Sequence, residues 1–293
     1  MQLNSNKYFK EILKDEITSE FVIADVLGNS DRQKEFTFSF EEISLDITRQ
    51  LISSKQFAKL KLLGRANNFE DNKKKLLNGS FTNVTENRFV THYLERNPNL
   101  LKKKAQRYRS FISFLNHRKI KNLINVGIGG SDLGVKMVYY ALKNEKKGPL
   151  LVNVSNLDVS NLQNILREKD ARETFFIINS KSFSTEETLE NLRFVKNFLN
   201  SKGLDLNDHA VAVTSFPEKA TEAGFEENAI FEVHEGVGGR FSIWSHFGLG
   251  LVASLGLDSY TQLLEGAYKM DKHFLEEKFE CNLPYIRFNK NME

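Results

Sequence analysis

Residues 174–199 of this 293-residue chain read TFFIINSKSFSTEETLENLRFVKNFL. The stretch begins with an apolar run, Thr174–Ile178, of the kind that forms a buried strand. It continues through a hydroxyl-rich loop, residues 180–188, into an amphipathic segment from Leu189 to Leu199. The pattern predicts a strand, a loop and a helix that follow one another directly.

The same order of elements recurs on both sides of this stretch. Strands are predicted at Asn122–Val126, Leu150–Val154, Thr174–Ile178, Ala210–Thr214 and Ala229–Val233, and helices at Leu133–Leu142, Val159–Arg167 and Thr185–Asn200. Strands that alternate with helices favour an α/β fold, a doubly wound parallel sheet over residues 99–258. Residues 1–98 are predicted to form an N-terminal helical segment without a β-rich block, because apolar residues recur at helical spacing in Tyr8–Ile17 and Ile43–Leu63.

Composition narrows the class of protein. A balance of 41 Lys and Arg against 38 Asp and Glu gives a net charge of +3, which argues against nucleic acid or an acidic membrane as the main partner. We expect the basic runs Lys73–Lys75 and Lys102–Lys104 to lie on solvated helix faces. The single cysteine, Cys281, excludes an internal disulfide and a cysteine-cluster metal site. With no signal-like apolar segment, the chain is expected in the cytoplasm, without a metal or a cofactor.

Two interpretations fit the hydroxyl-rich loop. A buried strand that turns directly into a helix aims backbone N–H groups and the positive end of the helix dipole at one point, which favours an anion such as phosphate. The loop also offers more hydroxyls than one helix cap can use, at Ser180, Ser182, Ser184, Thr185 and Thr188. The alternative is an ordinary helix cap, since Ser184 and Glu187 have the spacing of a capping box.

A glycine-rich loop, residues 127–134, follows the first predicted strand and reads GIGGSDLG. A dinucleotide fingerprint would need a third glycine where Asp132 stands, and no Gly-Lys-Ser/Thr follows for a nucleotide P-loop. Backbone at Gly130 can still approach a ligand closely, and Ser131 offers a hydroxyl at the start of the helix. This arrangement suits a polyol better than a dinucleotide. A dinucleotide-dependent enzyme remains the least favoured interpretation of the chain.

A second glycine-rich segment, residues 236–242, reads GVGGRFS and presents Arg240 from backbone that leaves access to it. We interpret Arg240 as a functional cation with Gly239 beside it. The alternative is a surface arginine on a flexible turn, or one that pairs with Glu235.

Taken in order, these motifs resemble the phosphoglucose isomerase family. The resemblance extends from about residue 36 to 284. Its motifs are Asn83–Arg88 with His92, Val126–Gly134, Val154–Asp158, Ser180–Thr188 and Val237–Ser245. It implies a sugar-isomerase-type fold and the interconversion of glucose 6-phosphate and fructose 6-phosphate.

The resemblance also implies roles for single residues. Ser180, Lys181, Ser182 and Thr185 would hold the sugar phosphate, while Gly130, Ser131 and Gly239 would line the sugar site. Arg240 would be catalytic, because a fixed guanidinium stabilises the negative charge of an enediolate intermediate more than it stabilises the neutral sugar. Family members form homodimers and carry a second sugar-isomerase-type subdomain.

The chain departs from the family pattern in length and at several positions. Residues 259–293 would only begin the second subdomain, so we expect a truncated or frameshifted end and no counterpart of the family's glutamate base, histidine or lysine. Glu186 would bring negative charge close to the phosphate unless it pairs with Lys181, and His246 would crowd the helix behind Arg240. We therefore expect an isomerase fragment of doubtful activity alone, or a non-catalytic sugar-phosphate sensor that needs a partner chain, such as a complementing C-terminal half.

Overall fold

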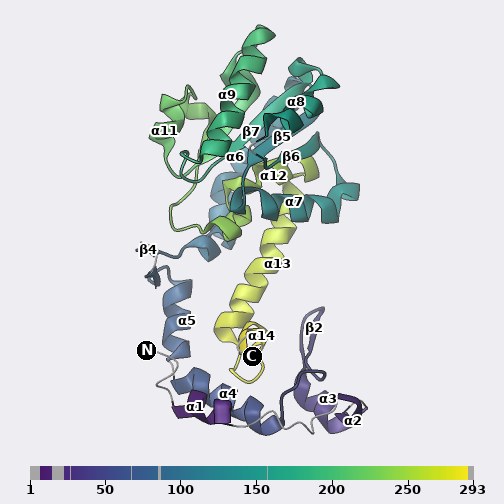
Figure 1. Cartoon of the computed structure of the whole chain (residues 1–293), viewed down its shortest axis with the longest axis vertical. Coiled ribbons are helices and arrows are strands. Elements are labelled where there is room, and N and C mark those ends of the chain that lie inside the picture. Colours follow the sequence, from purple (N-terminus) through teal and green to yellow (C-terminus); the bar gives the residue numbers. More distant parts are fainter. Residues whose placement is uncertain are drawn as a thin grey trace. The chain divides into compact units, whose positions relative to one another are not determined.

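The computed structural model describes residues 7–14, 23–26, 28–66, 68–84, 87–156 and 158–289 (Figure 1). These residues divide into two compact units. One contains the described residues up to Phe81 together with those from Lys269 onward, and the other is Thr82–Tyr268. The domain boundaries predicted after residues 98 and 258 stay predictions.

The second unit is built on a five-stranded parallel sheet in its described residues. Its strands lie in the order β6-β5-β7-β8-β9. Their bounds are β5 Asn122–Gly127, β6 Leu150–Val154, β7 Thr174–Asn179, β8 Ala210–Thr214 and β9 Ile230–Glu232. Every residue of β7 and β8 is buried, which explains why both strands read as continuous apolar runs.

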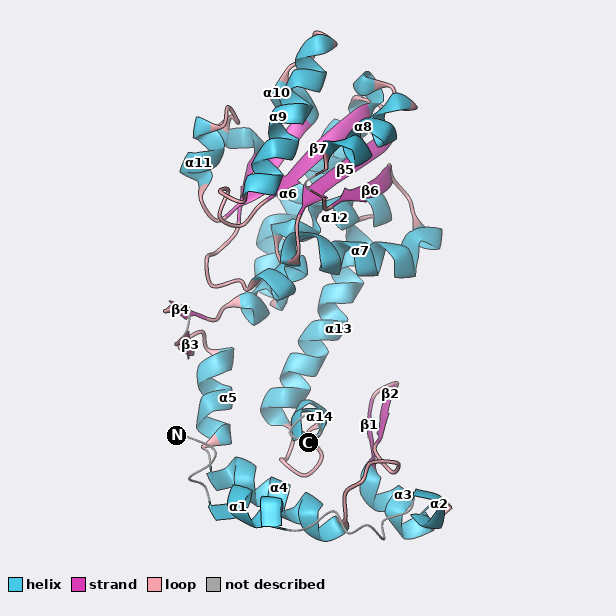
Figure 2. Ribbon diagram, in the orientation of Figure 1, coloured by secondary structure: helices cyan, strands magenta, loops and turns pink. Residues whose placement is uncertain are grey.

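Helices cover both faces of this sheet, which confirms the doubly wound α/β class (Figure 2). Helices α7, Gly130–Leu142, and α12, Leu249–Leu255, contact β5 and β6, whereas α9, Glu186–Ser201, contacts β5 and β7. Helix α8, Val159–Arg167, packs beside α9, and α11, Pro217–Glu222, contacts β8 and β9. One hydrophobic core joins these helices to the sheet.

The other elements of this unit are one long helix, α6, and several short segments. They are β3 Thr82–Asn83, β4 Arg88–Phe89, η2 His92–Arg96, α6 Pro98–His117, η3 Lys143–Glu145, η4 Ala171–Glu173, α10 Leu206–His209, η5 Glu227–Ala229, η6 Gly239–Trp244 and η7 His246–Gly248. Helix α13, Leu257–Glu276, includes the division between the two units.

The first unit has a small core of its own, formed by Phe36, Ile47, Ile52, Phe57, Leu60 and Ile286. Its elements are α1 Lys7–Lys14, α2 Ile23–Val26, α3 Ser30–Phe36, β1 Thr37–Phe40, β2 Ile43–Asp46, α4 Ser54–Ala66, α5 Phe69–Leu77 and α14 Leu283–Asn289.

The prediction of helical spacing from Ile43 was wrong at its start. Residues Ile43–Asp46 form strand β2, which pairs antiparallel with β1. Ile43, Leu45 and Ile47 alternate with polar residues, and their exposure falls from the first to the last. This is the period of a strand, and a turn at Glu41, whose φ is +49°, closes the hairpin. Apolar spacing resumes as a helix only in α4.

The expectation of solvated lysines was also wrong for two of them. Lys73 is buried, and its ammonium lies 2.8 Å from the Glu70 carboxylate and over the rings of Phe69 and Phe274. Lys104 forms an ion pair with Glu95, which is itself buried. A charged side chain is buried only with a partner, which is Glu70 for Lys73 and Glu95 for Lys104. A run of lysines in the sequence does not show which of them has such a partner.

Candidate functional site

The predicted motifs meet at the carboxyl edge of the sheet. The strand order reverses between β5 and β7, and the loops that follow these two strands leave in opposite directions. At this position the last residues of the two strands, Gly127 and Asn179, are register partners. A Cβ on Gly127 would lie 3.1 Å from the Cβ of Asn179 and 3.2 Å from that of Ser131, so the two loops begin in contact.

The two glycine-rich segments also touch, through Gly130 and Gly239. A Cβ placed on Gly130 would lie 2.4 Å from the carbonyl carbon of Gly239, too close for any side chain. The Ser242 hydroxyl donates to the carbonyl of Gly130 at 2.8 Å and fastens the contact. Helix α7 therefore packs against η6 backbone to backbone, and Arg240 stands directly beside the glycine loop.

The hydroxyl-rich loop after β7, here called the serine loop (residues 180–185), does not cap its helix with a side chain. Thr185 is the N-cap of α9, yet its hydroxyl makes no capping hydrogen bond in the described structure. The first N–H groups of a helix have no partner within it, so the start of α9 keeps donors available. The capping-box interpretation of Ser184 and Glu187 thus gains no support from the geometry.

Two features of this loop, at Ser180 and Phe183, are energetically unfavourable in the folded chain. Ser180 is 3% exposed, and its hydroxyl has no hydrogen-bond partner among the described residues. Phe183 has a φ of +46°, a left-handed conformation that costs a residue with a side chain about 1–2 kcal/mol. Its ring is buried against Phe225, which keeps the backbone in this state.

Lys181 does not direct its charge into open solvent. Its ammonium donates to the carbonyl of Val237 at 2.7 Å, so the side chain joins the serine loop to the segment that carries Arg240. Its own carbonyl accepts from the N–H of Ser215 and from the hydroxyl of Thr214. A pairing of Lys181 with Glu186, which would offset the negative charge of that carboxylate, is not among the ion pairs of the described residues.

Beneath the loops, three asparagines connect neighbouring strands. Asn179 donates to the Oδ1 of Asn125 at 2.7 Å, and Asn125 donates to the Oδ1 of Asn153 at 3.0 Å. Asn125 and Asn179 are fully buried. This ladder fixes the amide that ends β7, immediately before Ser180.

Arg240 is exposed, and no ion pair or hydrogen bond of its guanidinium is found in the described chain. The alternative pairing with Glu235 is not observed there. The carbonyl of Glu235 instead accepts from Arg88 at 2.9 Å.

Burial governs the other charged groups flagged in the sequence. Asp132 lies in the first turn of α7 and is 2% exposed, and this burial raises the pKa of its carboxyl, while Ser155 and Lys136 oppose the shift. His246 is buried against Tyr108 and Phe231, and burial lowers the pKa of its imidazole. Glu186 is exposed.

Two contacts at this edge were not predicted from the sequence. The Lys219 ammonium donates to the carbonyl of Ser182 at 3.2 Å from 37 residues away in the chain. His92 stacks on Phe241, the residue next to Arg240. The family motif had pointed to His92 without a role. Thr85, Glu86 and Leu157, which belong to two of the quoted motifs, lie outside the described residues.

Two negative findings apply to the described residues alone. They contain no group of three or more His, Cys, Asp or Glu side chains arranged to hold a metal ion. They also contain no helix with the length and apolar character needed to cross a membrane.

Curated proteins with similar sequences are glucose-6-phosphate isomerases. The protein from Colwellia psychrerythraea is 33% identical over 283 residues, which cover 88% of this chain and 52% of the relative. Its counterpart from Campylobacter jejuni subsp. doylei is 35% identical over 289 residues, covering 89% and 53%. This chain thus spans about half the length of the curated relatives it matches.

Solved structures share the fold. A glucose-6-phosphate isomerase from Chlamydia trachomatis superposes with a TM-score of 0.84 at 23% identity, over 99% of this chain and 60% of that one. A hypothetical protein from Thermus thermophilus gives a TM-score of 0.62 at 24% identity, over 80% and 54%. The family model described as phosphoglucose isomerase matches residues 46–288. This match and the sequence relatives show that the chain belongs to the phosphoglucose isomerase family.

Proposed function

We propose that this chain binds a hexose 6-phosphate and contributes the phosphate-binding part of an active site that interconverts glucose 6-phosphate and fructose 6-phosphate. The phosphate would lie at the serine loop, with Ser180, Lys181, Ser182 and Thr185 around it. The sugar would lie at the edge where the loop of Gly130 and Ser131 meets Gly239. No cofactor takes part in the reaction proposed.

One observation carries the phosphate assignment. The buried Ser180 hydroxyl has no hydrogen-bond partner among the described residues, and it precedes a helix whose N-cap residue makes no side-chain capping bond there. An unsatisfied buried polar group costs about 1–3 kcal/mol, which a phosphate oxygen that accepts its hydrogen bond would offset. The start of α9 would add N–H donors and the positive end of its dipole.

Arg240 would act on the reaction rather than on binding alone. Removal of the C2 proton from the open-chain aldose leaves an enediolate, and transfer of the O2 proton to O1 with return of a proton to C1 gives the ketose. Negative charge develops on the oxygens only after the C2 proton leaves. A guanidinium fixed beside them therefore lowers the barrier more than it tightens substrate binding, and a lost donor of this kind costs about 100- to 1000-fold in rate.

The proton itself needs a base that has no matched position in these 293 residues. We propose that the base comes from another polypeptide segment, a complementing C-terminal half. A cytoplasmic location belongs to the same proposal, because the lone Cys281 is a free thiol suited to a reducing compartment.

Calorimetry with fructose 6-phosphate tests the binding step. Replacement of both Ser180 and Thr185 by alanine should abolish measurable binding, whereas Ser184→Ala, an exposed hydroxyl in the same loop, should leave the affinity unchanged. Absence of binding by the unaltered chain would refute the phosphate assignment.

A coupled isomerase assay tests the catalytic step. The chain alone should show little turnover, and addition of the C-terminal half of the Campylobacter jejuni relative should restore it. Turnover by the chain alone near that of a full-length relative would show that a residue within it supplies the base. Binding without turnover under either condition would favour a sugar-phosphate sensor.

A further inference from the structure

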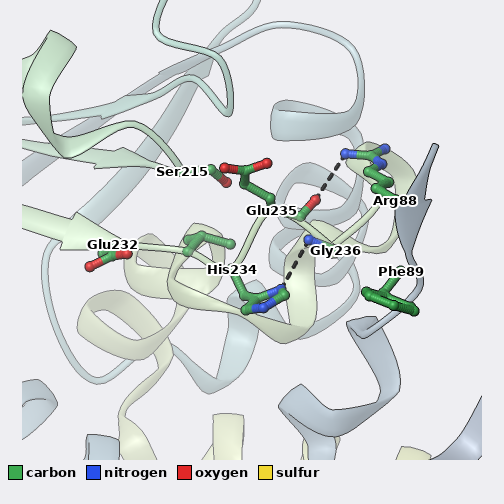
Figure 3. A pocket seen from close by; sticks show the side chains of 8 residues that line it. Arg88, Phe89, Ser215, Glu232, His234, Glu235 and Gly236 are labelled. Atoms are coloured by element: carbon green, nitrogen blue, oxygen red, sulfur yellow. Dashed lines mark hydrogen bonds between the residues drawn. The ribbon is translucent and has the colours of Figure 1, made fainter. Parts of the chain in front are cut away.

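The segment before η2 contacts the loop that carries Arg240, which we call the arginine turn (residues 234–241). Arg88 donates to the carbonyl of Glu235 at 2.9 Å (Figure 3). The N–H of Thr91 donates to the carbonyl of Gly236 at 3.0 Å. The Thr91 hydroxyl lies 3.1 Å from Nδ1 of His234. A Cβ on Gly236 would stand 2.4 Å from that hydroxyl, so the two segments touch at backbone level.

The last contact of this series is an aromatic stack next to Arg240. The ring of His92 lies over that of Phe241, with centroids 4.1 Å apart and planes 14° apart. Burial lowers the pKa of His92 to about 4, so the ring is neutral at pH 7 and stacks as an uncharged aromatic. Phe241 is 40% exposed and is bonded directly to Arg240, so the stack restrains the backbone from which the guanidinium extends.

Packing behind the turn is incomplete, which makes these contacts more important. A cavity of about 350 Å³ lies against residues 232–236, and its other walls come from Arg88, Phe89 and Ser215 (Figure 3). Side chains do not fill this side of the turn. Its position therefore depends on the contacts made elsewhere along the turn. These are the hydrogen bonds from residues 88–91, the bond from Lys181 to Val237, the contact of Gly239 with Gly130 and the stack at His92.

We propose that His92 is a positioning residue, which by stacking on Phe241 holds Arg240 where its guanidinium meets the negative charge of the enediolate. The proposal rests on the function proposed above for Arg240. A His92 that only stabilised the fold would affect every ligand alike. A positioning His92 affects only ligands that need Arg240.

Two ligands separate these cases in calorimetry with the full 293-residue chain. Inorganic phosphate reports on the serine loop alone. A five-carbon sugar hydroxamate that carries a 5-phosphate reports on both the serine loop and Arg240, because its planar hydroxamate imitates the enediolate. The variants are His92→Ala, His92→Phe, Arg240→Ala and the double variant His92→Ala with Arg240→Ala, and Leu94→Ala, an exposed site on η2, is the control.

The expected result is a split between the ligands. A stacked aromatic pair is worth about 0.5–1.5 kcal/mol, so His92→Ala should weaken hydroxamate binding about three- to tenfold and phosphate binding less than twofold. His92→Phe, which keeps a flat ring, should restore the hydroxamate affinity. In the Arg240→Ala background, His92→Ala should have no further effect.

Each other outcome has a distinct meaning. Equal weakening of both ligands, or effects of His92 and Arg240 that simply add, would overturn the positioning role and leave the proposed function standing. If His92→Ala does not fold, Phe241→Leu tests the same stack from its other side by the same criteria. If the unaltered chain binds neither ligand, the proposed function fails first and the role of His92 fails with it.

Discussion

The contact between Gly130 and Gly239 allows a prediction whose size follows from the geometry. A Cβ on Gly130 would lie 2.4, 2.6 and 2.8 Å from the carbonyl carbon, oxygen and Cα of Gly239. Ordinary contact begins at 3.4 Å, so Gly130→Ala must separate the two backbones by about 1 Å. Backbone in a packed region yields poorly, and such overpacking costs about 1–3 kcal/mol of unfolding free energy.

The same displacement should reach the proposed ligand site. Arg240 follows Gly239 directly, so a turn moved by about 1 Å takes the guanidinium out of hydrogen-bonding range of an enediolate. A charge-assisted hydrogen bond is worth about 1.5–3 kcal/mol, which corresponds to a loss of about ten- to 100-fold in affinity for the hydroxamate analogue. Phosphate affinity should change little.

Two other glycines are matched controls for this substitution. A Cβ on Gly239 would lie 3.9 Å from the Cα of Gly130, an ordinary contact, so Gly239→Ala should be mild although it alters the same pair. Gly266 lies inside α13 with nothing within 4 Å, so Gly266→Ala should stabilise the chain by up to about 1 kcal/mol through helix propensity.

Urea denaturation of the three variants measures the first effect, and calorimetry with the hydroxamate measures the second. The expected order of stability is Gly266→Ala, then Gly239→Ala, then Gly130→Ala. If Gly130→Ala is as stable as Gly239→Ala and binds the hydroxamate equally well, the backbone contact does not position the arginine turn, and the reasoning is refuted.

Three further predictions concern other contacts of the site. The pKa of His92 falls from 6.5 in the unfolded chain to about 4 in the folded chain, so lowering the pH from 6.5 to 4 favours the unfolded state. Because the imidazole is partly exposed, the free energy of unfolding of the unaltered protein should fall by about 1–2 kcal/mol relative to His92→Phe across this range. Urea denaturation at a series of pH values measures this difference. Lys181→Met removes the bond to the carbonyl of Val237 and should cost about 1.5–3 kcal/mol in the same assay, whereas an unchanged midpoint would mean that the bond contributes nothing. Asn125→Leu breaks the asparagine ladder and leaves the buried amide of Asn179 with only its 3.3 Å bond to the carbonyl of Phe247. Its thermal unfolding should therefore show a loss of about 1–3 kcal/mol, and a loss below the error of the measurement would contradict the ladder.

The sheet and its helices could be predicted because each element carries its own signal. Strands β6 and β8 and helix α8 have the predicted bounds, Leu150–Val154, Ala210–Thr214 and Val159–Arg167. Buried parallel strands read as short apolar runs, and a helix between them shows an apolar face at helical period. Strands β5 and β7 each extend one residue further, to Gly127 and Asn179, because these two residues pair with each other.

Contacts between distant segments could not be predicted in this way. Nothing near Ser182 in the sequence points to Lys219, and nothing near Arg240 points to His92. The meeting of Gly130 with Gly239 was implied only by the family resemblance, which assigned both residues to the sugar site. Such contacts arise from the packing of elements that are far apart in the chain, and they leave no local pattern in a single sequence.

Lys181 shows how this limit affects an argument about chemistry. A lysine among serines suggests a cation for the phosphate, yet its ammonium donates to the carbonyl of Val237. Glu186 and Glu187, in the first turn of α9, complement the helix dipole without bonding its N–H groups through a capping side chain. A phosphate at this loop would therefore be bound mainly by hydroxyls and backbone N–H groups, whose directions are fixed. Such a site selects its ligand by geometry, and its affinity should depend less on salt than that of a site built from lysines.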